Sequence, residues 1–371
     1  MEKLWKYKKI GEVCIVERGA SPRPIDKYIT DNESGINWIK IGDTSDSMYI
    51  TETAQKIIVE GMKKSRYVKP GDFLLSNSMS FGRPYILKID GCIHDGWLVL
   101  RDENALFDKR FLYYYLSSKT TYKKLKSMAV GGVVNNLNSE MVRNVIVPVP
   151  DKEEQSEIAD LFDKIKKILD DRKQELEQLD TLVKSRFVEL FGNVFLNTMK
   201  WEEHSLELIA DIVSGITKGR KMKQQTLMEV PYMAVSNVKD GYIDWTTIKT
   251  IEATEQEINQ YRLLPNDVLM TEGGDPDKVG RGAIIRKPLE NCIHQNHIFR
   301  VRLNTTYILP EFFAEYLQHQ RAKRYFLRCA KQTTGIASIN MKQLRALPVL
   351  IPPIELQNQF ADFVVSTDKS K

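Results

Sequence analysis

The most regular pattern of apolar and polar positions in this chain lies between Asp151 and Gly192. Twenty of these 42 residues are charged, and the apolar residues among them recur at steps of three and four positions. This spacing predicts a long helix with one apolar stripe, which is typical of a coiled-coil seam. With about 37 helical residues it would be about 55 Å long, and the stripe would need a partner helix. The stripe consists of Ile158, Leu161, Ile165, Leu169, Leu176, Leu179, Val183, Phe187 and Leu190.

A second helix of the same kind is predicted at the end of the chain. It follows Pro352 and carries Phe360 on its apolar stripe. Because a globular segment separates the two helices, the chain must turn back, so an antiparallel pair is expected. The second helix has at most 18 residues and looks truncated, which leaves the first without a mate from Leu176 to Leu190. Polar replacements of Leu179, Val183 and Phe187 should therefore block partner assembly and leave the domains folded.

The segments around the long helix have a mixed α and β pattern. Short apolar runs predict strands at residues 38–41, 73–75 and 97–100, and again at 232–235, 268–270 and 298–301. A single helix is expected after each set, from Lys109 to about Met128 and from Pro310 to about Ala330. The predicted fold class is α+β, with two similar mixed α/β domains separated by long helices that form an antiparallel coiled coil.

The two mixed segments repeat one another. Trp5 returns as Trp201, and the triplet Cys92-Ile93-His94 returns unchanged as Cys292-Ile293-His294, 200 residues later. A unit of this length can hold its own core, so the repeat predicts two related domains rather than a solenoid. The expected domains are residues 1–150 and 193–351, with the central helix at 151–192 and the distal helix at 352–371. At a constant offset of 202, Asn138, Arg143, Pro150, Glu153, Gln155, Ala159 and Asp160 match Asn340, Arg345, Pro352, Glu355, Gln357, Ala361 and Asp362.

Charge is divided between these segments. Residues 1–150 carry 23 Lys and Arg against 17 Asp and Glu, and residues 193–371 carry 23 against 20, whereas residues 151–192 carry 8 against 12. Two basic modules joined by an acidic spacer suit a polyanionic ligand with two similar sites, although mild basicity alone is weak evidence. No secretory signal or membrane-spanning run is present, so a cytoplasmic protein is expected.

Motifs for catalysis and metal binding are missing from the sequence. We find no Walker A motif, no dinucleotide-binding fingerprint and no nucleophile elbow, and the one Pro-Pro pair stands at a helix start. The repeated Cys-x-His allows a zinc site, but four closely spaced ligands are not present. A strand with a buried cysteine and a histidine that is structural or faces DNA is the favoured alternative. No metal site and no bound cofactor are predicted.

The order of these elements resembles the specificity subunit of type I restriction-modification systems. The resemblance rests on the duplicated Glu-x-Gln helix starts (Glu153/Gln155 and Glu355/Gln357), the Lys69–Asp72 turn and Phe81-Gly82-Arg83. It implies a non-catalytic subunit in which each domain reads one half of a split sequence in double-stranded DNA. It also implies that the helices set the half-site spacing and dock two methyltransferase subunits, which restriction subunits join. S-adenosylmethionine, ATP and magnesium would belong to those partners, and a second chain could complete the coiled coil.

Candidate DNA-binding residues fall into basic helix ends and polar loops. The basic ends suit phosphate contacts, but cations also favour helix C-termini for structural reasons. The loops suit base reading, because Arg pairs well with guanine and Asn with adenine. The residues after the histidine differ between the copies, Asp95-Gly96-Trp97 against Gln295-Asn296-His297, which makes them a further candidate. The candidates are Arg23, Ser76, Asn77, Ser78, Arg83, His94, Lys123, Lys124, Lys126, Lys218, Arg220, Asn237, Lys239, Thr271, Glu272, Arg281, His294, Gln295, Asn296, Arg324 and Lys331.

Two other functions remain open at this point. The chain could be a bivalent coiled-coil scaffold that recruits protein partners without specific DNA binding, or a DNA-modifying enzyme that acts alone. Salt-sensitive binding to duplex DNA would support DNA recognition over the scaffold function. Methyl transfer by the chain alone would support the enzyme.

Overall fold

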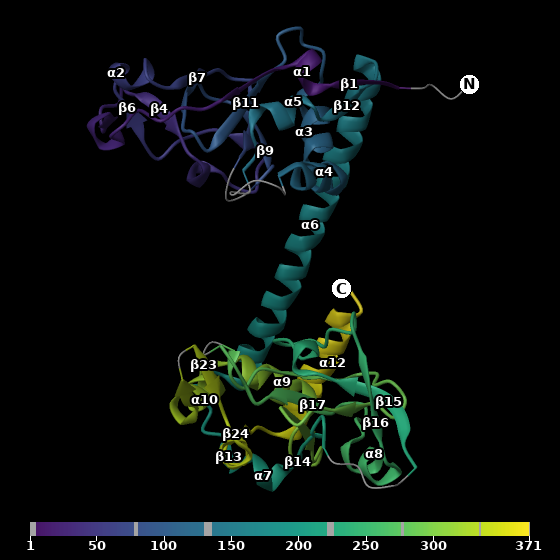
Figure 1. Cartoon of the computed structure of the whole chain (residues 1–371). Helices are drawn as coiled ribbons and strands as arrows, with labels where there is room; N and C mark the ends of the chain where they lie inside the picture. Colours follow the sequence, from purple (N-terminus) through teal and green to yellow (C-terminus); the bar gives the residue numbers. More distant parts are fainter. Residues whose placement is uncertain are drawn as a thin grey trace. The chain divides into compact units, whose positions relative to one another are not determined.

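The computed structural model describes residues 5–77, 81–129, 136–220, 226–275, 278–333 and 335–370. It divides into two compact units, an N-terminal unit of residues 1–171 and a C-terminal unit of residues 172–371. Each unit combines small sheets with short helices (Figure 1), which confirms the predicted mixed fold with two similar halves. The division falls inside helix α6 (Lys152–Phe191), so the domain boundaries derived from the sequence remain a prediction.

The N-terminal unit has two five-stranded sheets and one two-stranded ladder. One sheet has the order β2 (Ile15–Arg18), β11 (Trp97–Arg101), β8 (Phe73–Ser76), β9 (Pro84–Leu87) and β5 (Tyr49–Ile50). The other has the order β3 (Ile29–Thr30), β6 (Lys56–Ile57), β4 (Ile36–Ile39), β10 (Gly91–Ile93) and β7 (Arg66–Val68), and β1 (Lys6–Lys9) pairs with β12 (Ile146–Val149). The helices are α1 (Ile10–Val13), η1 (Ile25–Lys27), η2 (Ile41–Asp43), α2 (Val59–Met62), α3 (Lys109–Ser117), α4 (Lys119–Ala129) and α5 (Ser139–Arg143).

The C-terminal unit repeats this arrangement. Its four-stranded sheet has the order β14 (Ala210–Ser214), β21 (Ile298–Leu303), β17 (Val268–Thr271) and β19 (Gly282–Ile284). A three-stranded sheet joins β16 (Lys249–Ala253), β15 (Met228–Met233) and β20 (Ile293–His294), and another joins β18 (Gly273–Gly274), β23 (Ile336–Ser338) and β22 (Lys331–Thr333). A ladder pairs β13 (Glu202–Ser205) with β24 (Pro348–Ile351). The helices are α7 (Leu206–Ile209), η3 (Val235–Asn237), α8 (Glu255–Tyr261), α9 (Pro310–Gln318), α10 (Gln320–Cys329), α11 (Met341–Arg345) and α12 (Ile354–Asp368).

The two units share one topology. The antiparallel order β2-β11-β8-β9 returns as β14-β21-β17-β19, and the parallel pair β4–β10 returns as β15–β20. Each unit also pairs its first strand with the strand that precedes α6 or α12. The duplication inferred from the sequence is therefore a duplication of the fold.

The helix predicted after the strands is broken in both units. Ser118 and His319 have extended backbone angles, with ψ of 145° and 156°, so two helices form where one was expected. Ser118 Oγ accepts a hydrogen bond from the Thr121 N–H at 3.2 Å, which caps the start of α4. The His319 ring stacks on Phe187 at 4.6 Å between centroids, so packing holds the second break. Uninterrupted apolar spacing hid both breaks in the sequence.

Two buried glutamines attach the long helices to their units. Gln155 Nε2 donates to the carbonyls of Pro150 and Leu106 at 2.9 and 3.1 Å, and its Oε1 accepts from the Asp108 N–H at 2.7 Å. Gln357 makes the same three bonds, to the Pro352 carbonyl at 2.8 Å, the Tyr307 carbonyl at 3.0 Å and the Leu309 N–H at 2.8 Å. Both side chains are fully buried, which explains why the Glu-x-Gln motif occurs twice.

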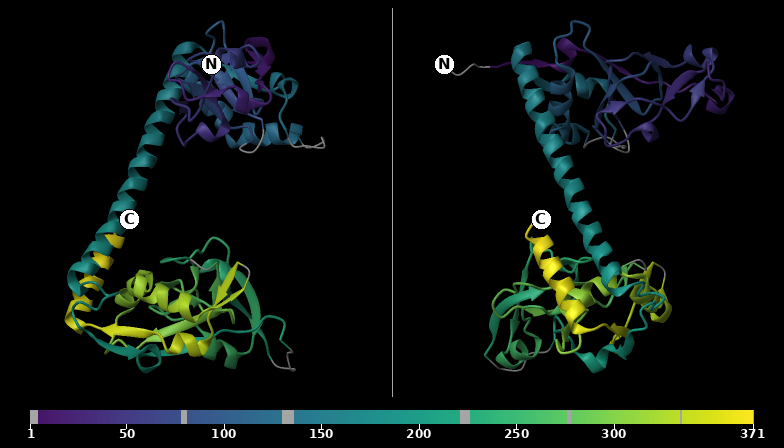
Figure 2. Two further views of the ribbon diagram at one scale, coloured as in Figure 1. Left: turned by 90° about the vertical axis from the view of Figure 1, so that its left-hand side faces the viewer. Right: turned by 180° about the vertical axis from the view of Figure 1, so that it is seen from behind.

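Helices α6 and α12 pack against each other within the C-terminal unit (Figure 2), in agreement with the predicted pair. The contact includes Phe187, so the expectation that α6 has no mate from Leu176 to Leu190 is wrong for the end of that segment. The Phe360 ring lies 5.3 Å from Phe187 and 5.7 Å from Phe191, and Arg186 covers the Phe363 ring at 5.9 Å. From Phe360 to Phe363 along α12, the contact moves back along α6 from Phe187 and Phe191 to Arg186, so the two helices are antiparallel. Helix α6 has 40 residues and α12 has 15.

The apolar stripe of α6 is divided between core and surface. Val183 is 8% exposed and Phe187 is fully buried in the core of the C-terminal unit, so polar replacements there would damage the unit itself. The prediction that these two residues can be exchanged without unfolding is therefore wrong. Leu179 and Leu190 are half-buried, and Ile158 packs against the N-terminal core. The exposed members are Leu161, Ile165, Leu169 and Leu176, and Phe162 and Ile168 next to the stripe are exposed as well.

Candidate nucleic-acid interface

The ends of β10 and β20 carry polar residues on matching backbones. We call residues 94–96 tip 1 and residues 295–297 tip 2. The Ile41 N–H donates to His94 Nε2 at 3.3 Å, and the Val235 N–H donates to Gln295 Oε1 at the same distance. One position further on, Arg18 Nε donates to the Asp95 carbonyl at 3.1 Å, and Ser214 Oγ donates to the Asn296 carbonyl at 2.7 Å. Because the donors occupy equivalent positions in the two units, His94 corresponds to Gln295 and Asp95 to Asn296.

This correspondence corrects the alignment of the repeated triplet. Ile93 pairs with Ile39 across the parallel ladder β4–β10, whereas His294 pairs with Met233 across β15–β20. The position of His294 is therefore that of Ile93, one residue away from the match by identity. Successive side chains on a strand point to opposite faces, so the shift turns His294 into the core. The prediction that His294 contacts DNA is contradicted by this burial.

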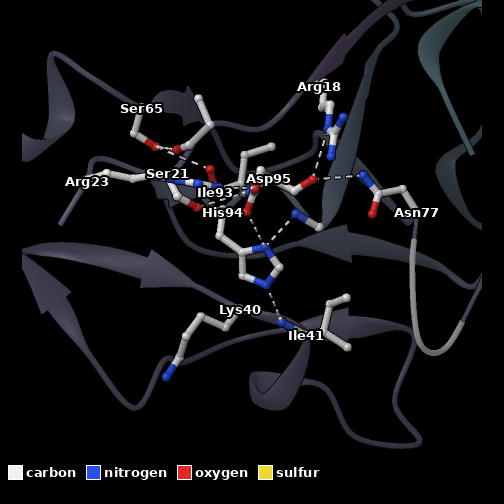
Figure 3. Close-up of polar contacts among 12 residues, drawn as sticks. Arg18, Ser21, Arg23, Lys40, Ile41, Ser65, Asn77, Ile93, His94 and Asp95 are labelled. Carbon is white, nitrogen blue, oxygen red and sulfur yellow. Dashed lines mark hydrogen bonds and ion pairs between the residues drawn. The ribbon is translucent and has the colours of Figure 1, made fainter. Parts of the chain in front are cut away.

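Tip 1 is a network of hydrogen bonds around Asp95 (Figure 3). Ser21 Oγ donates to Asp95 Oδ1 at 2.9 Å, and Arg23 Nη2 donates to Oδ2 at 3.3 Å. Asn77 Nδ2 donates to the Asp95 carbonyl at 2.8 Å. Partial burial acts to raise the pKa of the Asp95 carboxyl, but the hydrogen bond from Ser21, a backbone hydrogen bond at Asp95 and the nearby His94 and Arg23 together lower it more. The carboxylate is thus held ionised beside an Arg23 side chain that is 81% exposed.

The His94 imidazole is partly buried within tip 1. Burial lowers the pKa of the His94 imidazole, and the Gly96 N–H points to its Nδ1 at 2.6 Å. Its side chain is 21% exposed, so part of the ring edge reaches solvent. Both ring nitrogens face backbone N–H groups, Nε2 that of Ile41 and Nδ1 that of Gly96, so the ring serves to position the tip backbone.

Tip 2 presents different chemistry on the same frame. His297 Nδ1 lies 2.5 Å from Glu272 Oε2, and these side chains are 57% and 33% exposed. Gln295 and Asn296 next to them are half-buried. The Glu272 N–H donates to the His297 carbonyl at 3.0 Å, as the Asn77 N–H donates to the Gly96 carbonyl at 2.9 Å. Glu272 therefore corresponds to Asn77, and His297 to Gly96.

Glycines support both tips at close range. A Cβ at Gly19 would lie 2.1 Å from the His94 carbonyl oxygen, and a Cβ at Gly215 would lie 2.6 Å from that of Gln295, the equivalent tip residue. No other residue type fits either contact, which explains the recurrence of this glycine. The preceding strands thus pack directly on the tip backbones.

The buried His294 predicts acid sensitivity of the C-terminal unit. Its ring nitrogens face the carbonyls of Tyr261 at 3.0 Å and Val213 at 3.3 Å, and burial lowers its pKa to about 4. An unfolded histidine titrates near ~6.5, so between about pH 6.5 and 4 the unfolded state binds a proton that the folded state does not. Stability should therefore fall across this window as pH decreases, by on the order of a few kcal/mol. His294→Ile, which installs the residue found at this position in the N-terminal unit, should reduce the slope of unfolding free energy against pH, and an unchanged slope would contradict this explanation.

The predicted DNA-binding residues differ in accessibility. Arg23, Arg83, Lys123, Lys124, Lys126, Lys218, Arg324 and Lys331 are exposed. His94, Arg220, Lys239, Glu272, Arg281, Gln295 and Asn296 are half-buried. Ser76, Asn77, Asn237, Thr271 and His294 are buried, and Ser78 lies outside the described residues. The buried side chains are not presented to a ligand in this structure, which corrects their assignment as base-reading residues.

Several basic candidates already have partners within their unit. Arg220 binds both carboxylate oxygens of Glu257 at 2.5 and 2.7 Å, which lowers the pKa of Glu257 to about 2. Arg324 stacks on the Phe195 ring at 4.5 Å. Arg83 forms an ion pair with Asp46 at 3.2 Å, and Lys239 lies 3.8 Å from Asp244. The exposed lysines of α4 are therefore the stronger candidates for phosphate contacts.

The cysteines of the repeated motif are part of the core. Burial raises the pKa of Cys92 to about 11 and that of Cys292 to about 12, which disfavours the thiolate needed for metal binding. Within the described ranges, no group of three or more His, Cys, Asp or Glu side chains is arranged to hold a metal ion. No helix in the same part of the chain is long and apolar enough to cross a membrane.

Two units of one topology, each with a polar tip on a rigid frame and joined through a shared long helix, define a tandem recognition protein. The model of the type I restriction modification DNA specificity domain matches residues 2–179 and again residues 199–371. The chain belongs to this family and contains its domain twice. It is therefore a DNA specificity subunit and not an enzyme, which confirms the resemblance found in the sequence and excludes the scaffold and enzyme alternatives.

Relatives and solved structures agree with this assignment. The specificity subunit of the type I restriction enzyme EcoKI from Escherichia coli (strain K12) is 24% identical over 335 residues, which are 85% of this chain and 70% of that one. The S subunit of a type I restriction-modification system from M. genitalium superimposes with a TM-score of 0.56 at 15% identity, over 100% of this chain and 90% of that one. A chain from a study of complex assembly and conformational transition in a type I system gives the same TM-score at 16% identity, over 98% and 90%. At these identities the structural likeness shows the fold.

Proposed function

We propose that each unit reads one half of a split sequence in double-stranded DNA, as part of a type I restriction-modification complex. The observation that carries this proposal is the repetition of one topology with different polar side chains at equivalent tip positions. Two readers with the same frame and different contacts suit two half-sites with different sequences. The domains at residues 1–150 and 193–351 are the proposed readers.

We further propose that helices α6 and α12 set the distance between the half-sites. A helix of 40 residues is about 60 Å long, which exceeds the roughly 34 Å of one DNA turn that often separates half-sites. A length of this order supports a spacer role for residues 151–192.

The exposed apolar residues of α6 support docking of protein partners. Leu161, Ile165 and Leu169 are 57%, 43% and 64% exposed, and neighbouring exposed apolar residues of this kind mark interaction sites. In the C-terminal unit, a groove of about 820 Å³ is lined in part by Leu176, Phe360 and Val364. Two methyltransferase subunits are the proposed partners, and restriction subunits would join that assembly. A second copy of the chain or another chain could also pack on the exposed apolar residues of α6. S-adenosylmethionine, ATP and magnesium would be bound by those partners.

The proposal is tested by mapping methylated bases in a genome that carries this chain together with its partner subunits. A split recognition sequence with two different halves and a constant spacer is expected. Methylation at a single continuous sequence, or at none, would contradict it. Deleting the gene for this chain should abolish the signal.

The lysines of α4 should contribute affinity without sequence preference. Lys123→Ala with Lys124→Ala is expected to lower the slope of log K against log salt by up to about 2, since each phosphate contact contributes about 0.9. All DNA sequences should lose affinity alike, because phosphates carry no sequence information. Lys63→Ala with Lys64→Ala removes the same charge from exposed positions at α2, on the other side of this unit (Figure 1), and should leave the slope nearly unchanged. Equal effects of the two double variants would show that only net charge matters.

A further inference from the structure

We infer that tips 1 and 2 carry the sequence specificity of the two units, and that they read different bases because they present different groups on one backbone frame. This inference rests on the proposed function and names the residues that would perform it. It concerns His94, Asp95 and Arg23 in the N-terminal unit. In the C-terminal unit it concerns Gln295, Asn296, His297 and Glu272.

The frame is rigid and equal in both units. Each tip follows a short strand in a parallel ladder, and the glycine backbones at 19 and 215 leave no space beneath it. The N–H of the residue that follows β8 or β17 bonds to the last tip carbonyl in both units. Such a frame positions side chains within the narrow tolerance that base-edge hydrogen bonds require.

The groups on this frame differ in their hydrogen-bonding chemistry. Tip 1 offers an ionised carboxylate and a guanidinium, since Asp95 is 43% exposed and Arg23 is 81% exposed. Tip 2 offers two amides and an imidazole, with the carboxylate of Glu272 behind them. Arginine fits the O6 and N7 edge of guanine, amides fit adenine, and a carboxylate accepts from the cytosine amino group. A sequence reader needs such differences at equivalent positions, whereas a purely structural loop does not.

Arg23 is the most informative residue of the set. It is held by one contact of 3.3 Å to Asp95, and that carboxylate is itself fixed by Ser21. The Arg23 guanidinium is therefore held by one of its nitrogens, and its other N–H groups can donate hydrogen bonds to a base. The loop that follows Gly215 in the C-terminal unit carries Lys218 and Arg220 instead, and Arg220 is bound to Glu257.

The experiment exchanges tip chemistry between the units in the register that the structure defines. His94→Gln with Asp95→Asn gives tip 1 the two amides of tip 2, and Arg23→Ala removes the guanidinium. Each variant is expressed with its partner subunits, and methylated bases are mapped genome-wide. We expect the half-site read by the N-terminal unit to change at one or two bases, with methylation of the original sites reduced roughly tenfold, the discrimination of one bidentate base contact. The other half-site and the spacer should stay as they are.

Controls separate this inference from the proposed function. Asp26→Asn changes an exposed carboxylate of η1 and should leave both half-sites intact. Gln295→His with Asn296→Asp should alter only the other half-site. If a variant loses all methylation, selection of bound duplexes from a random library by the assembled complex reports its preference directly. Unchanged half-sites in both tip 1 variants would overturn the inference while the proposed function stands, and a wild-type complex without a split sequence would overturn the proposed function itself.

Discussion

Replacing Phe187 by alanine is expected to lower the free energy of unfolding of the C-terminal unit by about 3–5 kcal/mol. The ring is fully buried and lies between α9 and α12, with centroids 5.3 Å from both Phe312 and Phe360. Its removal leaves a cavity where three helices meet, and neighbouring aromatic rings can fill only part of it. Hydrogen exchange measured by mass spectrometry against denaturant would report the loss separately for each unit.

A control on the same helix distinguishes packing from helix stability. Leu169→Ala removes an apolar side chain that is 64% exposed, so its effect on unfolding should stay within about 0.5 kcal/mol. If both variants lost equal stability, the assignment of Phe187 to the core would be wrong. Leu169→Ala is also informative with partners present, because reduced assembly without reduced stability would locate the docking surface on the exposed stripe.

Replacing Gln357 by alanine should lower the stability of the C-terminal unit by about 3 kcal/mol, because it leaves three buried backbone groups without hydrogen-bond partners. These groups are the carbonyls of Tyr307 and Pro352 and the N–H of Leu309. The Leu309 amide should then exchange faster with solvent. Gln359→Ala, at an exposed position of the same helix, provides the control.

The same change in the N-terminal unit provides an internal test. Gln155→Ala should destabilise that unit by a similar amount and expose the Asp108 amide, while Glu153→Ala should have little effect. Effects that appear in one unit alone would show that the duplicated motif has different roles in the two halves. Effects in both would establish the glutamine as the attachment of each long helix to its reader.

Local sequence patterns determined much of this fold. The steps of three and four between Ile158 and Leu190 predicted α6, because helical geometry alone places such residues on one face. The Lys69–Asp72 turn named in the sequence is present, since the Lys69 N–H donates to Asp72 Oδ2 and the Asp72 N–H to the Lys69 carbonyl, both at 3.0 Å. The family resemblance was also available from the sequence, since it rests on motifs that occur twice in the same order.

Most features that only the tertiary structure decided depend on which face of a helix or strand a residue occupies. Spacing along α6 could not show that Phe187 lies in the core of a unit while Leu169 is exposed, because both occupy the same stripe. Identity between the two Cys-Ile-His triplets aligned His94 with His294, although the ladders pair His294 as the counterpart of Ile93. A strand changes faces at every residue, so a shift of one position converts a surface group into a buried one. The chain by itself therefore determined the long helix, the duplication and the family, whereas packing decided where the later helices break and pairing across the sheets decided which side chains are presented to a ligand.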